Sequence, residues 1–353
     1  MRDPTSAKRL SLGLSGRHSA FPTQRSRPRV AHLKIQAVRR LINADLTGGL
    51  LPSLPSHPAT GRQGDSRLLA IDRLTSVSSN LAQRTQTAGV LTVVVLGSLW
   101  WLPARALNFL FAAVILLGAW EWSLLAGWRS GSSRALYVAV IAIALALIGA
   151  LSHKPAFPHL LLTASLCAWL VAGNLIFRVQ RGSHSSPFSR SFLSLAGIVV
   201  LSPAWYALCQ LAQMRAHAGV LLVLLALVAV ADTAAFFSGR RFGRRRLADK
   251  VSPGKTWEGF CGALLAVSVM AWLGATAVDT PLVQRSLILL LCLVTVVFSV
   301  IGDLFESLVK RAAGVKDSGV LLPGHGGIMD RIDSLTAAAP VFLLGLRCLG
   351  TPW

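Results

Sequence analysis

The chain has 353 residues, of which 53% are hydrophobic and only 14% are charged, and its formal net charge at pH 7 is +21. A mean hydropathy of +0.59 excludes an ordinary soluble domain and predicts an integral membrane protein. Most positive residues lie in the N-terminal tail and in loops beside apolar segments, so we expect membrane lipids, and no nucleic acid, as partners.

Residues 1–79 differ in composition from the rest of the chain. They are basic and rich in Ser, Pro and Gly, and no apolar period persists in them. Such a segment buries too little apolar area to offset its ordering entropy, so we predict a disordered basic extension. A transit peptide, a tail that binds anionic lipids and a start codon placed too far upstream remain open as alternatives.

Residues 80–353 are predicted to form one transmembrane domain. Nine apolar segments of near-spanning length predict an all-α, polytopic integral membrane protein with about nine transmembrane helices. The segments are 88–102, 106–127, 135–151, 158–177, 192–211, 219–237, 260–278, 287–302 and 335–350.

Five cysteines lie within these apolar segments, and none forms a CxxC pair. We interpret them as small buried side chains, and we expect neither a disulfide framework nor a zinc site.

The connections between the segments alternate in positive charge. Those after the first, third, fifth and seventh segments hold one Lys or Arg each, whereas the others hold two to seven. With the N-terminus inside, the positive-inside rule places the richer connections in the cytoplasm. We therefore predict an integral membrane protein with a polar site on the cytoplasmic side.

Asp232 lies well inside an apolar segment, where a carboxylate is costly unless it faces a partner or a water-filled cavity. A hydrogen bond that only packs two helices together is the alternative.

The connection that follows contains SPGKTWEG. Residues 252–254 predict a turn, Lys255 offers a cation, and Thr256 is suited to cap a helix that begins near Trp257; backbone donors at such a helix start suit a phosphate. A P-loop is excluded, because Asp249 stands where GxxxxGK[ST] requires glycine.

Charged residues gather again after residue 302. If the preceding helix continues, Asp303, Glu306 and Lys310 share one face, which is either a solvated stripe of ion pairs or a site for Mg²⁺ and a polyphosphate. Asp330 and Asp333 share a face if a helix starts near residue 328. Acids in such numbers beside cations predict metal-dependent phosphoryl or nucleotidyl transfer at the membrane surface.

The run SLVKRAAGVKDSGVLLPGHGGIMDRID at 307–333 resembles the signature of the CTP:phosphatidate cytidylyltransferase (CDP-diacylglycerol synthase) family. The stretches DTAAFFSGRRFG, SPGKTWEG and NLAQRT are also similar to that family, so the resemblance covers residue 80 to the C-terminus. It implies transfer of the cytidylyl group from CTP to phosphatidate, giving CDP-diacylglycerol and pyrophosphate. It implies Mg²⁺, leaves room for a second, monovalent cation, and is compatible with a homodimer.

The resemblance also implies roles for individual residues. Asp303 and Asp330 would be metal ligands, with Asp333 and Glu306 completing or supporting the site. The catalytic residues would be Asp303, Asp330, Lys310 and His325, of which His325 would orient phosphate or handle a proton. Substrate binding would involve Asp232, Ser252, Lys255, Thr256, Arg311, Lys316, Asp317, Gly326, Gly327 and Arg331.

Three other functions are compatible with parts of the sequence. A CTP-dependent polyprenol or phytol kinase is disfavoured by the intact GHGGxxDRxD run. A transporter would use Asp232 to mark its pathway, but the sequence has no evident inverted repeat. A membrane scaffold leaves the clustered charges unexplained.

Overall fold

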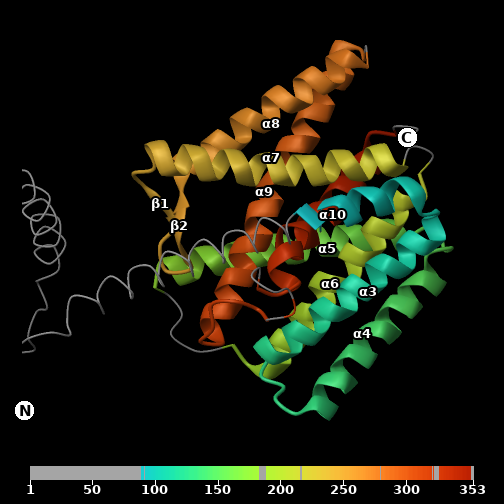
Figure 1. Cartoon of the computed structure of the whole chain (residues 1–353), viewed down its shortest axis with the longest axis vertical. Coiled ribbons are helices and arrows are strands. Elements are labelled where there is room, and N and C mark those ends of the chain that lie inside the picture. The colour runs from blue at the N-terminus through green and yellow to red at the C-terminus, as the bar shows by residue number, and fades with distance from the viewer. Residues whose placement is uncertain are drawn as a thin grey trace, which may run out of the picture. The chain divides into compact units, whose positions relative to one another are not determined.

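The computed structural model describes residues 89–90, 92–182, 188–214, 217–278, 280–319, 321 and 326–350. All of them belong to the compact unit Leu69–Trp353, and the predicted extension 1–79 lies outside the described residues. A short helix, Thr92–Trp101, comes first. It is followed by α3 (Ala104–Leu125), α4 (Gly131–Leu151), α5 (Phe157–Gln180), α6 (Arg190–Ala212), α7 (His217–Phe242), β1 (Arg246–Ala248), β2 (Ser252–Thr256), α8 (Trp257–Ala277), α9 (Leu282–Ala312) and α10 (Met329–Cys348) (Figure 1).

Each of the nine predicted apolar segments coincides with a helix. Within the described ranges, the seven helices α3 to α9 are long and apolar enough to cross a membrane. The first segment forms the helix Thr92–Trp101, which is too short to span a bilayer by itself. The last segment forms most of α10, whose first turns carry charged side chains. The protein is thus an all-α, polytopic membrane protein, apart from one small hairpin.

Residues 252–256 form a strand, so the turn predicted at residues 252–254 was wrong. Strand β2 pairs with β1 in an antiparallel hairpin in which Arg246 faces Thr256 and Ala248 faces Ser252. The turn lies at residues 249–251 instead. Proline is tolerated in a strand that has a free edge, as Pro253 has in this two-stranded hairpin.

Helix caps and aromatic packing explain much of the local structure. The Ser189 hydroxyl caps α6 by accepting from Phe192 N at 3.1 Å. In the centre of the bundle, the rings of Trp122 on α3 and Trp169 on α5 lie 6.3 and 5.9 Å from the ring of Phe305 on α9. The apolar core therefore holds α9 in place through Phe305.

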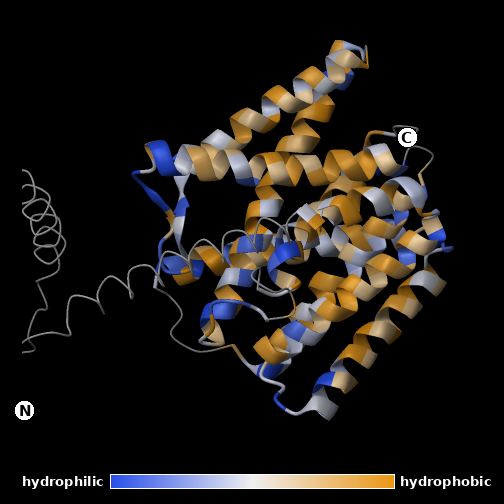
Figure 2. Cartoon of the chain, viewed as in Figure 1, coloured by the Kyte–Doolittle hydropathy of each residue, from blue (hydrophilic) through white to orange (hydrophobic). Residues whose placement is uncertain are grey.

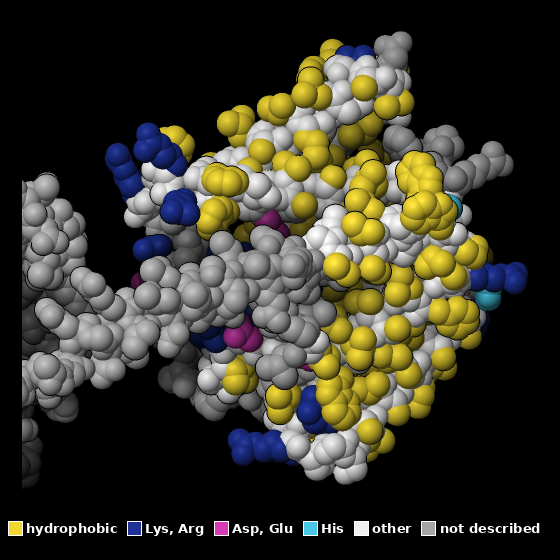
Figure 3. All heavy atoms as spheres, in the orientation of Figure 1, with side chains coloured by type: hydrophobic (Ala, Val, Ile, Leu, Met, Phe, Trp, Pro, Cys, Tyr) yellow, Lys and Arg dark blue, Asp and Glu magenta, His cyan; other side chains and the backbone are white. Residues whose placement is uncertain are grey.

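The outer faces of the helices are apolar, as a lipid environment requires. Large hydrophobic side chains are exposed along most helices, whereas Lys and Arg gather at helix ends and on the hairpin (Figures 2 and 3). Cys167, Cys261 and Cys348 are exposed, which corrects their interpretation as buried side chains; Cys209 and Cys292 are buried, and all five are free thiols.

The connections predicted to share one side of the membrane lie at the same end of the bundle. In the α7–α8 connection, Lys250 N donates to Gln180 Oε1 at the end of α5. The guanidinium of Arg190, at the start of α6, lies 5.1 Å from the ring centre of Trp128 in the α3–α4 connection. The α9–α10 connection lies at the same end, because Ser318 Oγ donates to Glu121 in the last turn of α3.

Candidate active site

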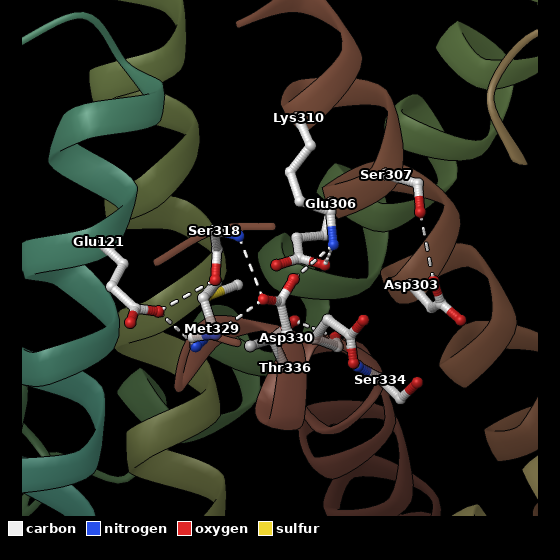
Figure 4. Close-up of polar contacts among 12 residues, drawn as sticks. Glu121, Asp303, Glu306, Ser307, Lys310, Ser318, Met329, Asp330, Ser334 and Thr336 are labelled. Carbon is white, nitrogen blue, oxygen red and sulfur yellow. Dashed lines mark hydrogen bonds and ion pairs between the residues drawn. The ribbon is translucent and has the colours of Figure 1, made fainter. Parts of the chain in front are cut away.

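The acidic residues of α9 and α10 meet because the two helices approach closely at Gly302. A Cβ atom on Gly302 would lie 2.7 Å from Asp333 O and 3.1 Å from Ala337 Cβ, so only glycine allows this approach without a shift. Both predicted helical spacings are confirmed, since α9 continues to Ala312 and α10 begins at Met329. Glu306 of α9 and Asp330 of α10 therefore face each other in a polar centre between the two helices (Figure 4).

Lys310 lies between the two helices and pairs with an acid from each. Its Nζ is 2.6 Å from Glu306 Oε2 and 2.6 Å from Asp330 Oδ1. The other carboxylate oxygen of Asp330 accepts from Gly327 N at 2.9 Å and from Ser318 N at 3.1 Å. Burial raises the pKa of Asp330, but the hydrogen bonds from Lys310, Gly327 and Ser318 outweigh it and lower the pKa below its usual value. Asp330 is thus held as an anion.

Asp303 connects this centre to the hairpin. Lys255 Nζ, on β2, lies 2.5 Å from Asp303 Oδ2, and Ser307 Oγ donates to Asp303 Oδ1 at 3.4 Å. Asp232 is exposed on α7, and the charges of Asp303 and Lys255 act on its carboxyl group. The structure therefore brings Asp232 and Lys255, which are predicted substrate-binding residues, beside the acids of α9.

The centre contains more negative than positive charge. Burial raises the pKa of Asp333 well above its usual value, and the neighbouring charges of Asp303 and Glu306 raise it further. Within the part of the chain that the structure describes, Glu306 Oε1 is buried and has no donor, and the carboxyl groups of Glu306 and Asp333 lie against each other. Excess acid and an unsatisfied carboxylate oxygen fit a divalent cation that prefers oxygen ligands. Within the described residues, however, no three His, Cys, Asp or Glu side chains already form a ligand set.

The other predicted site residues that the structure describes differ in their contacts and exposure. The Thr256 hydroxyl accepts from Gly259 N at 3.1 Å, which confirms it as the cap of α8. Ser252 is half-buried in β2, and Gly327 supplies a backbone donor to Asp330 beside Gly326, whose φ is +82°. His325 lies outside the described residues. Four predicted substrate-binding residues are exposed, namely Arg311, Lys316, Asp317 and Arg331.

One buried acid was missed by the sequence analysis. Glu121, on α3, is 2% exposed. Its Oε2 accepts from Ser318 Oγ at 3.0 Å and from Met329 N at 2.8 Å. The signal was available, because Glu121 is a lone acid in an apolar segment, as Asp232 is.

Comparison with known proteins gives the family. Residues 82–349 match the model of the cytidylyltransferase family. The chain is 41% identical over 272 residues to the phosphatidate cytidylyltransferase of Pseudomonas aeruginosa, covering 76% of this chain and 98% of that protein. It is 35% identical over 285 residues to the phosphatidate cytidylyltransferase of Haemophilus influenzae, covering 74% of this chain and 97% of that protein. The chain therefore belongs to the cytidylyltransferase family.

Proposed function

We propose that this protein is a phosphatidate cytidylyltransferase, which makes CDP-diacylglycerol and pyrophosphate from CTP and phosphatidate for phospholipid biosynthesis. The observation that carries the proposal is the match to proteins of that name over nearly their whole length. The cluster of acids and lysines at one end of the membrane helices supports it, because both substrates are polyanions and one of them remains in the lipid.

The chemistry demands positioning more than acid–base catalysis. A phosphate oxygen of phosphatidate attacks the α-phosphorus of CTP, a new P–O bond forms, and the bond to the β-phosphate oxygen breaks to release pyrophosphate. The attacking oxygen is already anionic, so no strong general base is required. The enzyme must instead bring two anions together and stabilise the charge on the leaving group.

The side chains of the polar centre suit that task. Lys255 and Lys310 are the cations available to the phosphates, and each is held in place by an acid of α9. Asp303, Glu306, Asp330 and Asp333 are the residues that would hold Mg²⁺. Bound there, Mg²⁺ would neutralise the polyphosphate and act as a Lewis acid.

The location of the site completes the proposal. The connections rich in Lys and Arg lie at the end of the bundle that carries the polar centre. By the positive-inside rule we place this end in the cytoplasm, where CTP is available, and the helices in a bacterial inner membrane.

The test is a direct assay in detergent. Purified protein is incubated with α-labelled CTP, phosphatidate and Mg²⁺, and labelled CDP-diacylglycerol and unlabelled pyrophosphate are expected. When a polyprenol or phytol is supplied as the acceptor, release of labelled CDP without labelled CDP-diacylglycerol would identify a CTP-dependent kinase instead. The double variant Asp303→Asn/Asp330→Asn should be inactive, whereas Asp249→Asn, an exposed acid in the hairpin turn, should keep wild-type turnover. Full turnover by the double variant would refute the assignment of the site.

A further inference from the structure

Glu121 is a buried carboxylate to which the proposed reaction assigns no role. It lies on an apolar helix at 2% exposure, and among the described residues its buried Oε1 has no hydrogen-bond partner. Arg134, whose charge interacts with Glu121, directs its hydrogen bonds to Ser123 Oγ and Trp120 O instead. A carboxylate in such surroundings destabilises the folded protein, so we expect it to have a structural or functional role that offsets this cost.

The contacts of Glu121 lead to Asp330 through a shared residue. Ser318 donates its hydroxyl to Glu121 Oε2 at 3.0 Å and its backbone N–H to Asp330 Oδ2 at 3.1 Å. Met329 N, directly before Asp330 in the chain, donates to the same oxygen of Glu121 at 2.8 Å. The two carboxylates are thus connected twice, once through Ser318 and once through the backbone that starts α10 (Figure 4).

Two glycines make room for this arrangement. A Cβ atom on Gly319 would collide with the carboxyl group of Glu121, and one on Gly327 would collide with both that group and the Ser318 hydroxyl. Gly327 also donates its N–H to Asp330. The backbone of the α9–α10 connection is therefore packed directly against the carboxylate of α3 at Gly319 and at Gly327.

We propose that Glu121 is a positioning residue, which fixes Ser318 and the start of α10 so that Asp330 is held against Lys310. The inference rests on the proposed function. Among the described residues, Glu121 makes no hydrogen bond or ion pair with Lys255 or Lys310. It acts from α3 as an acceptor that determines where the backbone donors of Asp330 lie.

The test compares substitutions at Glu121 in the CDP-diacylglycerol assay, with thermal unfolding measured on the same detergent samples. We expect Glu121→Ala to lower kcat by about 10–100-fold, as substitutions of residues that support metal ligands do. Glu121→Gln keeps one acceptor oxygen and should recover most of this loss. Ser165→Ala is the matched control, because it changes another buried polar side chain, on α5, that has no hydrogen-bond partner. It should leave kcat unchanged.

A double-variant cycle separates positioning from a general loss of folding. If Glu121 acts through Asp330, the Asp330→Asn substitution should cost much less kcat in the Glu121→Ala background than in the wild type. Additive losses would overturn the inference, as would wild-type kcat in a folded Glu121→Ala protein.

Ser318→Ala carries the test if Glu121→Ala fails to fold. It removes one hydrogen bond to Glu121 and keeps the backbone N–H that binds Asp330, so a several-fold loss of kcat is expected and an unchanged kcat would overturn the proposal. A wild-type protein that makes no CDP-diacylglycerol would refute the proposed function instead.

Discussion

Lys310 is the side chain whose removal should disturb the polar centre most. Methionine at this position keeps the length of the side chain but removes the charge that lies 2.6 Å from Glu306 and 2.6 Å from Asp330. At an effective dielectric constant of about 20, each contact has a gross Coulomb attraction of about 6 kcal/mol, most of which desolvation offsets. The side chains of Lys310 and Glu306 are 12% and 1% exposed, so water can do little to screen an acid left alone.

We therefore expect Lys310→Met to lower the free energy of unfolding by about 3–5 kcal/mol, the usual cost of removing one partner of a buried pair. The double variant Lys310→Met/Glu306→Gln should recover about 2 kcal/mol of that loss, because the amide leaves no uncompensated buried charge. Turnover should not recover, because the cation proposed to bind phosphate is still missing.

Chemical unfolding in mixed micelles, monitored by tryptophan fluorescence, measures these free energies. Lys154→Met is the matched control, since Lys154 is exposed in the α4–α5 connection, and its effect should stay within about 0.5 kcal/mol. The reasoning fails if Lys310→Met is as stable as the wild type. It also fails if the Glu306→Gln substitution adds to the loss rather than reducing it.

Three further predictions concern the surroundings of Lys310. Asp333→Asn should raise the thermal midpoint of the metal-free protein, because it replaces a carboxyl group whose ionisation is disfavoured by burial and by the neighbouring acids. It should also abolish any rise in midpoint on adding Mg²⁺, and a Mg²⁺ titration by differential scanning fluorimetry tests both effects. Gly302→Ala should force α9 and α10 apart, lowering stability by about 1–3 kcal/mol and also reducing turnover, whereas alanine at Gly274, which has open space around it, should not disturb packing. Thr256→Ala should cost about 1 kcal/mol through loss of the α8 cap, and Thr256→Ser should keep the cap; wild-type stability of the alanine variant would contradict this role.

Features set by local sequence could be predicted well. The nine apolar segments, the faces shared by Asp303 with Glu306 and by Asp330 with Asp333, and the Thr256 cap all follow from helical periodicity or from one neighbouring residue. The grouping of the Lys- and Arg-rich connections at one end of the bundle was predicted from loop charge alone. These features require no knowledge of which helices are neighbours.

Features that depend on helix neighbours could not be predicted. Nothing local to Glu121 reveals that its hydrogen-bond partners lie about two hundred residues later in the chain. The pairing of Lys255 with Asp303 likewise depends on how the hairpin lies against α9. The turn predicted at residues 252–254 failed for a related reason, because pairing with β1 outweighed the turn preference of Pro and Gly.

Because α9 is one uninterrupted helix, it limits which insertions and deletions the family can accept. Its 31 residues extend about 46 Å, more than the roughly 30 Å of bilayer hydrocarbon, with Asp303 and Glu306 in the C-terminal third. One residue inserted before Gly302 would rotate those acids by about 100° and shift them by about 1.5 Å, away from α10 and Lys255. Relatives should therefore vary in the length of their connections but keep a constant residue count in α9, because this helix fixes the position of its acids relative to the lipid.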